Sequence, residues 1–477
     1  MLLDEHDRRL SFGACRARAE RVAAGLFALG IADATPVTWQ LPTRIESVLF
    51  SLALARLGAV QNPILPLYRE REVAAVLRET GARWLAVPGT FRGFDHAAMA
   101  RRLRAETGGA FEILDADAPL PEGDPALLPP PPADGDAVRW LYTTSGTTAA
   151  PKCARHTDAT LIAGGTGLAL ALDARPEDVG SIAFPYTHIG GPDYLVMLLL
   201  RGMSAVLLES FVPESAVAAF RRHGVTLSGG STAFYLAFLT EQRKRPGERL
   251  LPSLRALAGG GAPKPPEVFW QVRRELGVPI LHGYGMTECP MIASGTPADS
   301  DEQLANTDGR PVHGCEVRVV DGEIRVRGPM LAKGYTDPAL TAEAFDPGGF
   351  FATGDLGHVR PDGHVVLTGR KKELIIRKGE NISPREIEDL LQTHPSVGAV
   401  AVIGLPDRER GERVCAVVET RPGAAPLDLA ALVAHCRQAG LMTQKIPEQL
   451  EVVDALPRNA TLKILKHELK ARFLRTS

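Results

Sequence analysis

The sequence has no excess of charge of either sign. Its 54 Lys and Arg residues against 56 Asp and Glu residues leave a net charge of −2. A chain without a basic excess has no general electrostatic signature of binding to nucleic acid or to an anionic membrane. We therefore expect neither partner, and any anion that the protein binds must be held by local positive charge.

The sequence also lacks an apolar run that could cross a bilayer. The most apolar window, YLVMLLLRGMSAVLL, is interrupted by Arg201 and Gly202. It is shorter than the roughly 20 residues that a spanning helix needs. The window predicts a buried helix followed by a buried strand, without stable membrane insertion.

The six cysteines are scattered, and no two of them form a CxxC pair. Zinc sites and disulfide frameworks depend on close spacing or on a small secreted chain, so we expect reduced thiols. The N-terminus, MLLDEHDRRLSF, is charged from its fourth residue and has no apolar stretch of the signal-peptide type. Together these features predict a cytoplasmic protein.

The 477 residues exceed what one hydrophobic core supports, which predicts several domains or subdomains. In the first hundred residues, helical patterns such as IESVLFSLALARLGAV alternate with strand patterns such as ATPVTWQL. This alternation predicts an α/β fold with a parallel sheet. The segment 115–136 contains four consecutive prolines, Pro129–Pro132, which exclude helix and central strand. It is either an extended surface connection or a linker between domains.

Over residues 309–367 the pattern changes to short alternating strands. Two turns, VDGE and RPDGH, carry Asp-Gly, which is typical of hairpin tips. After the motif GRKKE, a helix is predicted at SPREIEDLLQTH with Ser383 as its N-cap, and two strands and another helix follow. We therefore predict a large domain, residues 1–369, and a small α+β domain, residues 370–477.

The stretch TTSGTTAAPK, residues 143–152, is rich in hydroxyl side chains and follows the strand-like run VRWLY. Backbone N–H groups and hydroxyls in such a loop can surround phosphoryl oxygens, and Lys152 adds a positive charge. Taken alone, the stretch is equally compatible with a Ser/Thr-rich turn. Its spacing differs from GxxxxGK[ST], which argues against an ordinary P-loop nucleotidase.

Further motifs supply groups that suit a nucleotide. LAGGGAP, residues 257–263, predicts a strand and a Gly turn whose backbone a flat ligand can approach. HGYGMTE places a ring at Tyr284 and a carboxylate at Glu288, and FATGDLG places Asp355 after a tight turn, where it can bind ribose hydroxyls. Basic side chains follow in TGRKKELIIRKGENISPREIE and LPRNATLKILK.

In this order and at these separations, the motifs resemble the adenylate-forming superfamily of acyl-CoA synthetases, adenylation domains and luciferases over essentially the whole chain. The stretch GAVQNPILPLYREREV, residues 58–73, is similar to ligases of the cyclohexanecarboxylate–CoA type. The resemblance implies a large N-terminal domain of two α/β subdomains and a small β-barrel-like subdomain. A small, mobile α+β domain would follow, with a hinge near Lys372.

The resemblance also implies an AMP-forming acid:CoA ligase. Such an enzyme joins a carboxylate to the α-phosphate of ATP, releases pyrophosphate and then passes the acyl group from AMP to a thiol. The implied cofactors are ATP or a supplied acyl-adenylate, Mg²⁺ and coenzyme A. The first step brings two anions together, so it needs positioning and positive charge more than covalent chemistry.

Matched motif by motif, the resemblance implies a role for each site residue. Thr287 would contact the α-phosphate, Glu288 would hold Mg²⁺, and Lys463 would bridge the acyl and α-phosphate oxygens. The β- and γ-phosphates would be held by Thr144, Ser145, Gly146, Thr147, Thr148 and Lys152. The nucleoside would be held by Gly261, Ala262, Tyr284, Gly285, Asp355 and Arg370.

The second step implies a rotation of the small domain, a hinge-type transition. Lys463 would leave, and the face that carries Gly379 would arrive to line the path of the thiol. Lys372 would be the hinge residue. His188, in YTHIGG, would lie beside the acyl pocket and gate it, although a histidine in such a place is also compatible with packing alone.

Two positions depart from the family pattern, and both belong to adenylation. Ala149 and Leu462 stand where relatives have Gly, Ala149 in the phosphate loop and Leu462 just before Lys463. Where such a Gly has positive φ, a residue with a Cβ costs on the order of 1–2 kcal/mol. The segment for thioester formation is intact. The chain is thus either a full two-step ligase or an enzyme that performs only the second step on a supplied acyl-adenylate.

The substrate and acceptor are predicted from weaker signals. The small residues of LSGGSTAF would leave room for an alicyclic, aromatic or polycyclic acid. CoA is expected as acceptor because no carrier domain is present, with a carrier protein as the alternative. A non-catalytic nucleotide-binding partner protein would be expected to lack Glu288, Asp355 or Lys463, which are all present, and GGSTA only approximates the GxSxG of serine hydrolases.

Overall fold

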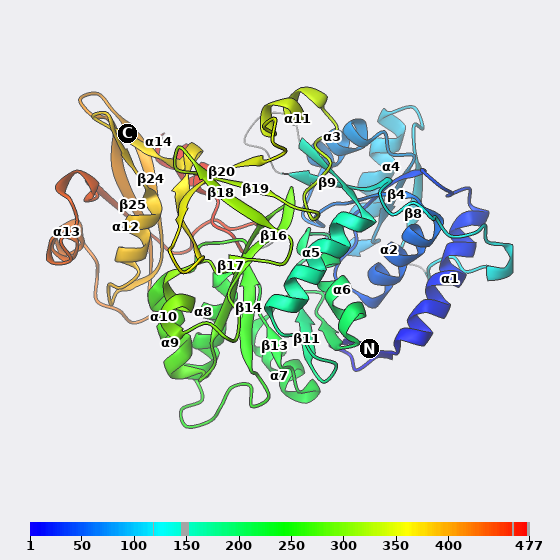
Figure 1. The fold of residues 1–477 in the computed structure, drawn as a ribbon, viewed down its shortest axis with the longest axis horizontal. Coiled ribbons are helices and arrows are strands. Elements are labelled where there is room, and N and C mark those ends of the chain that lie inside the picture. The colour runs from blue at the N-terminus through cyan, green and yellow to red at the C-terminus, as the bar shows by residue number, and fades with distance from the viewer. Residues whose placement is uncertain (118, 145–151, 460–461, 475–477) are drawn as a thin grey trace.

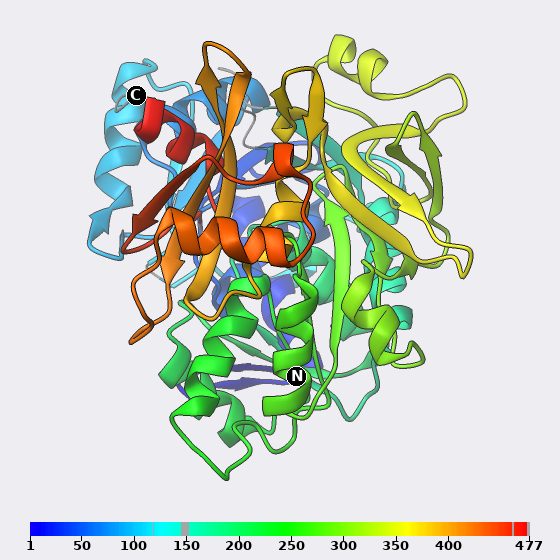
Figure 2. The same ribbon diagram turned by 90° about the vertical axis from the view of Figure 1, so that its left-hand side faces the viewer.

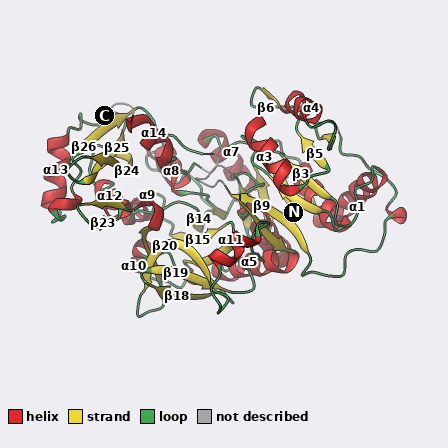
Figure 3. Ribbon diagram, turned by 90° about the horizontal axis from the view of Figure 1, so that it is seen from above, coloured by secondary structure: helices red, strands yellow, loops and turns green. Residues whose placement is uncertain are grey.

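The computed structural model describes residues 1–117, 119–144, 152–459 and 462–474. It has mixed α/β structure, with a large N-terminal domain and a small C-terminal domain (Figure 1). Seen from above, the first α/β sheet and the C-terminal domain lie at opposite ends of the molecule (Figure 3). The fold class predicted from the sequence is therefore confirmed.

The first subdomain is built on a six-stranded sheet with the order β10-β9-β4-β3-β5-β8. Every neighbouring pair is parallel except β9 and β10, which form an antiparallel hairpin. The strands are β3 Pro36–Trp39, β4 Val60–Pro63, β5 Trp84–Val87, β8 Glu112–Asp115, β9 Val138–Thr144 and β10 Lys152–Thr157. The helices that alternate with them are α1 Phe12–Ala28, α2 Ile45–Leu57, α3 Glu70–Thr80 and α4 His96–Glu106.

The proline-rich segment connects β8 to β9 within this one sheet, so it does not link domains. It crosses α1, where Gly123 N–H donates to Arg21 O over 2.9 Å. Gly25 of α1 allows the contact, because a Cβ there would lie 2.3 Å from Pro121 O. A short 3₁₀ turn, Pro125–Leu127, is its only regular element in the described residues.

The second subdomain contains two further sheets. One has the order β11-β12-β1-β2, with β1 Leu2–Asp4, β2 Arg9–Leu10, β11 Val179–Ile182 and β12 Ser204–Leu207. The other comprises β13 Leu227–Ser228, β14 Ala256–Gly260, β15 Ile280–Met286, β16 Cys289–Ser294 and β17 Arg310–Pro311. Their helices are α5 Asp158–Ala171, α6 Gly190–Arg201, α7 Pro213–His223, α8 Thr232–Arg243, α9 Pro266–Glu275 and α10 Asp301–Asn306.

The most apolar window of the sequence forms α6 and the buried strand β12, as predicted. In the described part of the chain, no helix is both long and apolar enough to cross a membrane. All six cysteines are buried and unpaired with one another, which agrees with the expected reduced thiols.

The third subdomain is an antiparallel sheet with the order β18-β19-β20-β21. Its elements are β18 Glu316–Val320, β19 Glu323–Arg327, β20 Phe351–Val359, β21 Val365–Arg370 and the helix α11 Pro338–Ala344. Asp321 and Gly322 form the predicted hairpin tip with φ of 50° and 78°, the positive values that a tight hairpin turn needs.

The C-terminal domain packs a sheet of β22 to β26 between helices, in front of the large domain in Figure 2. Its elements are β22 Ile375–Arg377, β23 Glu380–Ile382, β24 Val397–Asp407, β25 Gly411–Thr420, β26 Gln449–Val453, α12 Pro384–Leu391, α13 Leu429–Gln438 and α14 Lys466–Leu474. Ser383 is the N-cap of α12, but its hydroxyl donates to Thr368 O rather than capping the helix. The boundary at 369/370 stays a prediction; it falls within β21, one residue before the strand ends at Arg370 and the 3₁₀ turn Lys371–Glu373 begins.

Candidate active site

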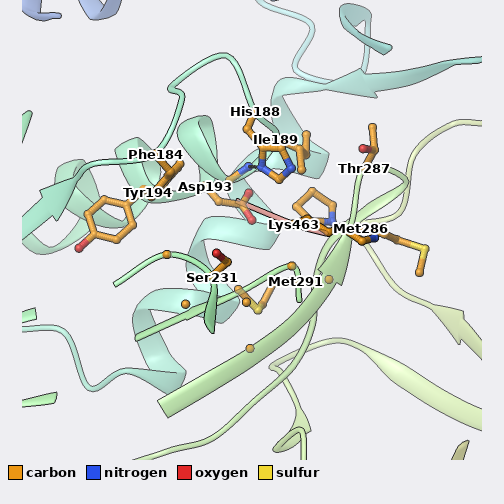
Figure 4. Close-up of a pocket in the computed structure, with 18 of the residues that line it drawn as sticks. Phe184, His188, Ile189, Asp193, Tyr194, Ser231, Met286, Thr287, Met291 and Lys463 are labelled. Atoms are coloured by element: carbon orange, nitrogen blue, oxygen red, sulfur yellow. Dashed lines mark hydrogen bonds between the residues drawn. The ribbon is translucent and has the colours of Figure 1, made fainter. Parts of the chain in front are cut away.

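A cavity of about 400 Å³ lies where strands of the large domain end beside the last loop of the small domain. Figure 4 shows side chains from the α6 region, from the 286–291 turn and from the C-terminal loop around one space. Among the cavity-lining residues are Tyr68, Thr144, Phe184, His188, Asp193, Gly230, Ser231, Gly261, Gly285, Thr287, Glu288, Met291, Arg370, Asn459 and Lys463. Both domains therefore contribute to it.

Lys463 reaches the cavity from a tightly bonded loop. Its N–H donates to Asn459 Oδ1 over 2.9 Å, and Asn459 N–H donates back to Lys463 O over 2.9 Å. Burial, aided by the nearby Arg370 guanidinium, lowers the pKa of Lys463 to about 8. The ammonium is thus held at a cost in a place where an anion would stabilise it.

Asp355 on β20 connects two of the predicted nucleoside residues. Arg370 Nε lies 2.9 Å from Asp355 Oδ1, and Tyr284 OH donates to Oδ2 over 2.8 Å. Burial opposes the charge on Arg370, but the Asp355 and Glu373 carboxylates together outweigh it and raise the arginine pKa above its ordinary value. Asp355 itself is buried, so this network fixes the orientation of both partners.

Glu288 lies at the turn between β15 and β16. Tyr335 OH donates to its Oε1 over 2.6 Å, and Lys152 Nζ lies 5.4 Å from the centre of the Tyr335 ring. The preceding residue, Thr287, is held by His156, whose Nε2 donates to Thr287 O over 2.8 Å. Tyr335 and His156 of the large domain thereby fix this turn, and Tyr335 also brings it near Lys152.

His188 precedes α6 and lines the cavity beside Lys463. Its Nδ1 accepts a hydrogen bond from Gly190 N–H over 3.3 Å. Burial, together with the charge of Lys463, lowers the pKa of His188 to about 4. The ring is therefore neutral near pH 7, with its proton on Nε2.

The predicted site residues fall into four groups. Thr144, His188, Gly261, Gly285, Thr287, Glu288, Arg370 and Lys463 line the cavity. Lys152, Tyr284 and Asp355 contact its walls as described above, and Ala262 follows Gly261 directly. Gly379 and Lys372 lie elsewhere, at the β22–β23 hairpin tip and in the 3₁₀ turn after β21. Ser145, Gly146, Thr147, Thr148 and Ala149 lie outside the described residues.

The glycines near the cavity also have a packing cause. A Cβ on Gly229 would lie 1.8 Å from Ala258 O, and one on Gly285 would lie 2.1 Å from Pro290 O. Both distances are far inside van der Waals contact, so these positions need glycine whatever the ligand. The small residues of LSGGSTAF therefore do not by themselves report the size of an acyl group.

Leu462, the residue before Lys463, has a φ angle of 61°. This is the left-handed region, where a Cβ is unfavourable. Its N–H donates to Asn459 O over 2.9 Å, and its side chain packs against the core of the large domain. The condition under which this substitution carries a conformational cost is thus met.

Among the cavity and wall residues that were not predicted are Tyr335, Asn459 and Asp193, whereas Ser231 was noted only as one of the small residues of LSGGSTAF. Nothing in the local sequence marks Tyr335 or Asn459. Asp193 did carry a signal, because it is a charged residue at the start of the apolar run YLVMLLL. A lone acid in an apolar helix is a candidate functional group.

The fold is the one that the resemblance to adenylate-forming enzymes implied, and comparisons with known proteins agree. The model of the AMP-binding enzyme family matches residues 1–336, and that of the AMP-binding enzyme C-terminal domain matches residues 386–463. The chain therefore belongs to the AMP-binding enzyme family. Within it, the chain is an AMP-forming acid:CoA ligase, a class that uses ATP, Mg²⁺ and CoA.

Individual relatives cover nearly the whole chain. The medium-chain fatty-acid–CoA ligase of Escherichia coli (strain K12) is 30% identical over 498 residues, 99% of this chain and 88% of that protein. The 2-hydroxy-7-methoxy-5-methyl-1-naphthoate–CoA ligase of Streptomyces carzinostaticus is 33% identical over 503 residues, 97% and 88% of the two chains. ATP-bound MatB from Rhodopseudomonas palustris superposes with a TM-score of 0.88 at 28% identity, covering 100% and 96% of the chains.

Proposed function

We propose that this ligase activates an aromatic, alicyclic or polycyclic carboxylic acid as its acyl-adenylate and transfers the acyl group to CoA. One observation carries the proposal: Lys463 of the small domain and the Thr287–Glu288 turn of the large domain line one cavity. A lysine and a carboxylate that come together from separate domains suit a reaction in which anions must be joined and then released.

In the first step, a carboxylate oxygen of the acid attacks the α-phosphorus of ATP, and pyrophosphate leaves with the bonding electron pair. The Lys463 ammonium neutralises the approaching acyl and phosphate oxygens. Asp355 and Arg370 hold the ribose, and Tyr284, Gly261, Ala262 and Gly285 border the base. These assignments rest on the mutual contacts of Asp355, Arg370 and Tyr284.

The triphosphate would lie between Thr144 and the Thr287–Glu288 turn. Lys152 and the stretch Ser145–Thr148 would hold its β- and γ-phosphates. Glu288 suits Mg²⁺, because this ion binds through one or two carboxylates plus substrate phosphates and water. Glu288 Oε1 accepts from Tyr335, which orients the carboxylate. In the described residues, no cluster of three or more His, Cys, Asp or Glu side chains forms a site that would bind a metal without the nucleotide.

The second step exchanges AMP for a thiol. The CoA thiolate attacks the acyl carbonyl carbon, the C–O bond to AMP breaks, and AMP departs as the anion. Gly379 would line the path of the thiol after a rotation of the small domain about Lys372. The neutral His188 would stay beside the acyl carbonyl in both steps.

The acyl class is supported by the residues around the cavity and by its relatives' names. Phe184, Tyr68 and Met291 provide flat and adaptable apolar surface. The similarity of residues 58–73 to the cyclohexanecarboxylate type falls on the stretch that contributes Pro63, Ile64, Leu65 and Tyr68 to the lining. The two relatives above are named for a fatty acid and a naphthoate, so straight-chain acids are the comparison class.

A panel of acids with ATP, Mg²⁺ and CoA tests the proposal. We expect AMP release and acyl-CoA formation, followed by mass spectrometry, with ring-containing acids ahead of straight-chain acids of equal carbon number. Replacing CoA with a phosphopantetheinylated carrier protein tests the alternative acceptor. Faster loading of the carrier than of CoA would overturn the CoA assignment.

A second candidate function is favoured by Leu462. Its φ of 61° beside Lys463 is a specific reason for slow adenylation, in an enzyme that would then use a supplied acyl-adenylate. Acid-dependent ATP–pyrophosphate exchange without CoA isolates the first step, and synthetic acyl-adenylate with CoA isolates the second. Robust exchange excludes this alternative; absent exchange with fast thioester formation excludes the two-step ligase.

A further inference from the structure

Asp193 presents a carboxyl group to the cavity from the inner face of α6. Only 1% of its surface is exposed, and it lines the cavity with His188 of the same region. Figure 4 shows the oxygen atoms of Asp193 and Ser231 directed into the same space from two sides. Ser231 precedes α8 on the far side of the cavity.

Neither oxygen of the Asp193 carboxyl has a hydrogen-bond partner among the described residues. The Ser231 hydroxyl is also buried and unpartnered there, although it occupies an N-cap position where a serine side chain usually bonds its own helix. Leaving a buried polar group unpaired is destabilising. Two such groups facing one cavity indicate that their partner is a ligand.

The acid Asp178 shows what a structural buried carboxylate looks like in the same subdomain. Arg255 Nη2 lies 2.7 Å from Asp178 Oδ2, and Thr226 Oγ1 donates to Oδ1 over 2.6 Å. Its pKa is lowered because these partners outweigh the burial. Asp193 has the burial without the partners, so structural stability does not explain it.

The neighbouring helix leaves room for the carboxyl group. A Cβ on Gly164 of α5 would lie 2.7 Å from Asp193 Oδ1, so any larger residue at 164 would push the carboxyl away. From Tyr194 to Leu200 the side chains that follow in this helix are apolar or aromatic. A leucine at 193 would avoid the cost of the buried acid, which makes the presence of aspartate informative.

We propose that Asp193, aided by Ser231, selects acids whose acyl part carries a hydrogen-bond donor, a hydroxyl or an amino group. The inference rests on the proposed function and adds to it the polarity of the acyl group. The carboxyl accepts the donor of the substrate, and the serine hydroxyl completes the contact. Substrates that lack a donor leave both buried groups unpaired, and a site of this kind rejects them.

The protonation of Asp193 separates the two kinds of donor. Burial raises the pKa of Asp193 well above its ordinary range. Burial thus favours the protonated carboxyl, to which a hydroxyl binds without a change in protonation. An ammonium group requires an ionised carboxylate, so its binding releases one proton.

Matched aromatic acids test the proposal: benzoic acid against its 2-, 3- and 4-hydroxy and 2-, 3- and 4-aminomethyl derivatives, whose aminomethyl groups are ammonium ions near pH 7. For the full-length enzyme, we expect at least one donor-bearing acid to exceed benzoic acid in kcat/KM by roughly tenfold or more. Asp193→Leu reduces this ratio to near one, and Ser231→Ala reduces it less. The exposed carboxylate of Glu106 provides the matched control, because Glu106→Gln leaves the ratio unchanged.

Asp193→Asn is the second variant, which keeps the proposal testable if Asp193→Leu does not fold. The amide keeps an oxygen acceptor but no negative charge, so it retains part of the preference for a hydroxyl and loses the preference for an ammonium. Isothermal titration calorimetry in two buffers of different ionisation enthalpy detects the proton that the Asp193 carboxyl releases when a substrate with an ammonium group binds. Proton release identifies the ammonium as the recognised donor, and its absence identifies the hydroxyl.

Each failure has a distinct meaning. Equal or better turnover of benzoic acid overturns the inference while the proposed function stands. A donor preference that survives both Asp193→Leu and Asp193→Asn shows that another group selects the substrate, which also overturns it. If no acid yields AMP or a thioester, while synthetic acyl-adenylates are also inert with CoA, the proposed function itself fails.

Discussion

Arg370 Nε lies 2.9 Å from Asp355 Oδ1, across the last two strands of the large domain. Asp355 faces Arg370 directly in the register of β20 and β21. Because Arg370 precedes the 3₁₀ turn that leads into the small domain, this pair lies at the junction of the two domains, and the nucleoside site that we propose would lie there too. Residues that bind the nucleotide and residues that move would then be adjacent.

Asp355→Asn should weaken nucleotide binding. The amide removes the charge that faces Arg370, and a hydrogen bond to a charged group contributes about 1.5–3 kcal/mol. We expect the Kd for AMP, measured by calorimetry, to rise roughly tenfold or more. Tyr284→Phe keeps the ring and removes only one hydrogen-bond donor, so it should raise the Kd for AMP by less. An equal rise in Kd would show that the Tyr284 hydroxyl, and not the Asp355 charge, determines the binding of AMP.

The adenylation step should slow as the pH rises through about 8. Burial lowers the pKa of Lys463 to about 8, and the positive charges of Arg370 and Lys466 act in the same direction. The carboxylates of Glu373 and Asp355 raise this pKa, but by less. Lys463 is charged below that pH and neutral above it, so kcat/KM for ATP–pyrophosphate exchange should fall about tenfold per unit above pH 8. Lys463→Arg remains charged throughout and should give a lower but flat profile in this range.

The same pKa has a consequence for stability. An unfolded Lys463 titrates near 10.5 and the folded one near 8, so the unfolded chain binds more protons between these values. Stability from this group therefore rises with pH over that interval and is lowest below pH 8. Lys463→Met should raise the thermal unfolding midpoint at pH 7. The difference between the unfolding midpoints at pH 7 and pH 10 should be smaller in this variant than in the wild type.

Leu462→Gly should accelerate adenylation if the left-handed backbone limits it. Glycine adopts φ near 61° without the cost that a Cβ brings. We expect ATP–pyrophosphate exchange to rise severalfold, with little change in thioester formation from acyl-adenylate. Leu462→Ala is the matched control: it removes the branched side chain but keeps the Cβ, so a gain with alanine as large as with glycine would point to bulk instead of strain.

Gly229→Ala should destabilise the large domain whatever the substrate. Its Cβ would lie 1.8 Å from Ala258 O, a clash between backbones that cannot turn aside. We expect a loss of about 3 kcal/mol or more of unfolding free energy in urea. Gly13→Ala in α1, where a Cβ meets nothing within 4 Å, should be neutral or slightly stabilising.

Local patterns predicted much of this molecule. The helix–strand alternation, the Asp321–Gly322 hairpin and the helix formed by the apolar window depend on neighbouring residues, and the structure has them. The cavity residues were found through motif order, because a shared site constrains several segments at once. The composition of the proline-rich segment 115–136 is the same whether it joins strands or domains, but the α/β pattern that resumes after it favours a surface connection, and it joins β8 to β9 of one sheet.

Other features depend on contacts that no local pattern encodes. The pairing of Tyr335 with Glu288 and the unpartnered state of Asp193 follow from tertiary packing. The need for glycine at 229 arises from a strand that lies far along the chain, so the sequence suggested room for a substrate where the backbone needs the space. Ser383 has the right position for a cap, but a competing carbonyl at Thr368 takes its proton.

The strand β1 can take its place in its sheet only after β12 has been synthesised. Leu2 and Leu3 are buried and pair with Ala205 and Val206 of β12. During synthesis β1 leaves the ribosome before β12, and the interval is roughly 10–40 s at ordinary elongation rates. Throughout that time the apolar strand β1 lacks its partner strand and is exposed to chaperones or to self-association. A bulky group fused next to β1 would hinder the folding of the second subdomain.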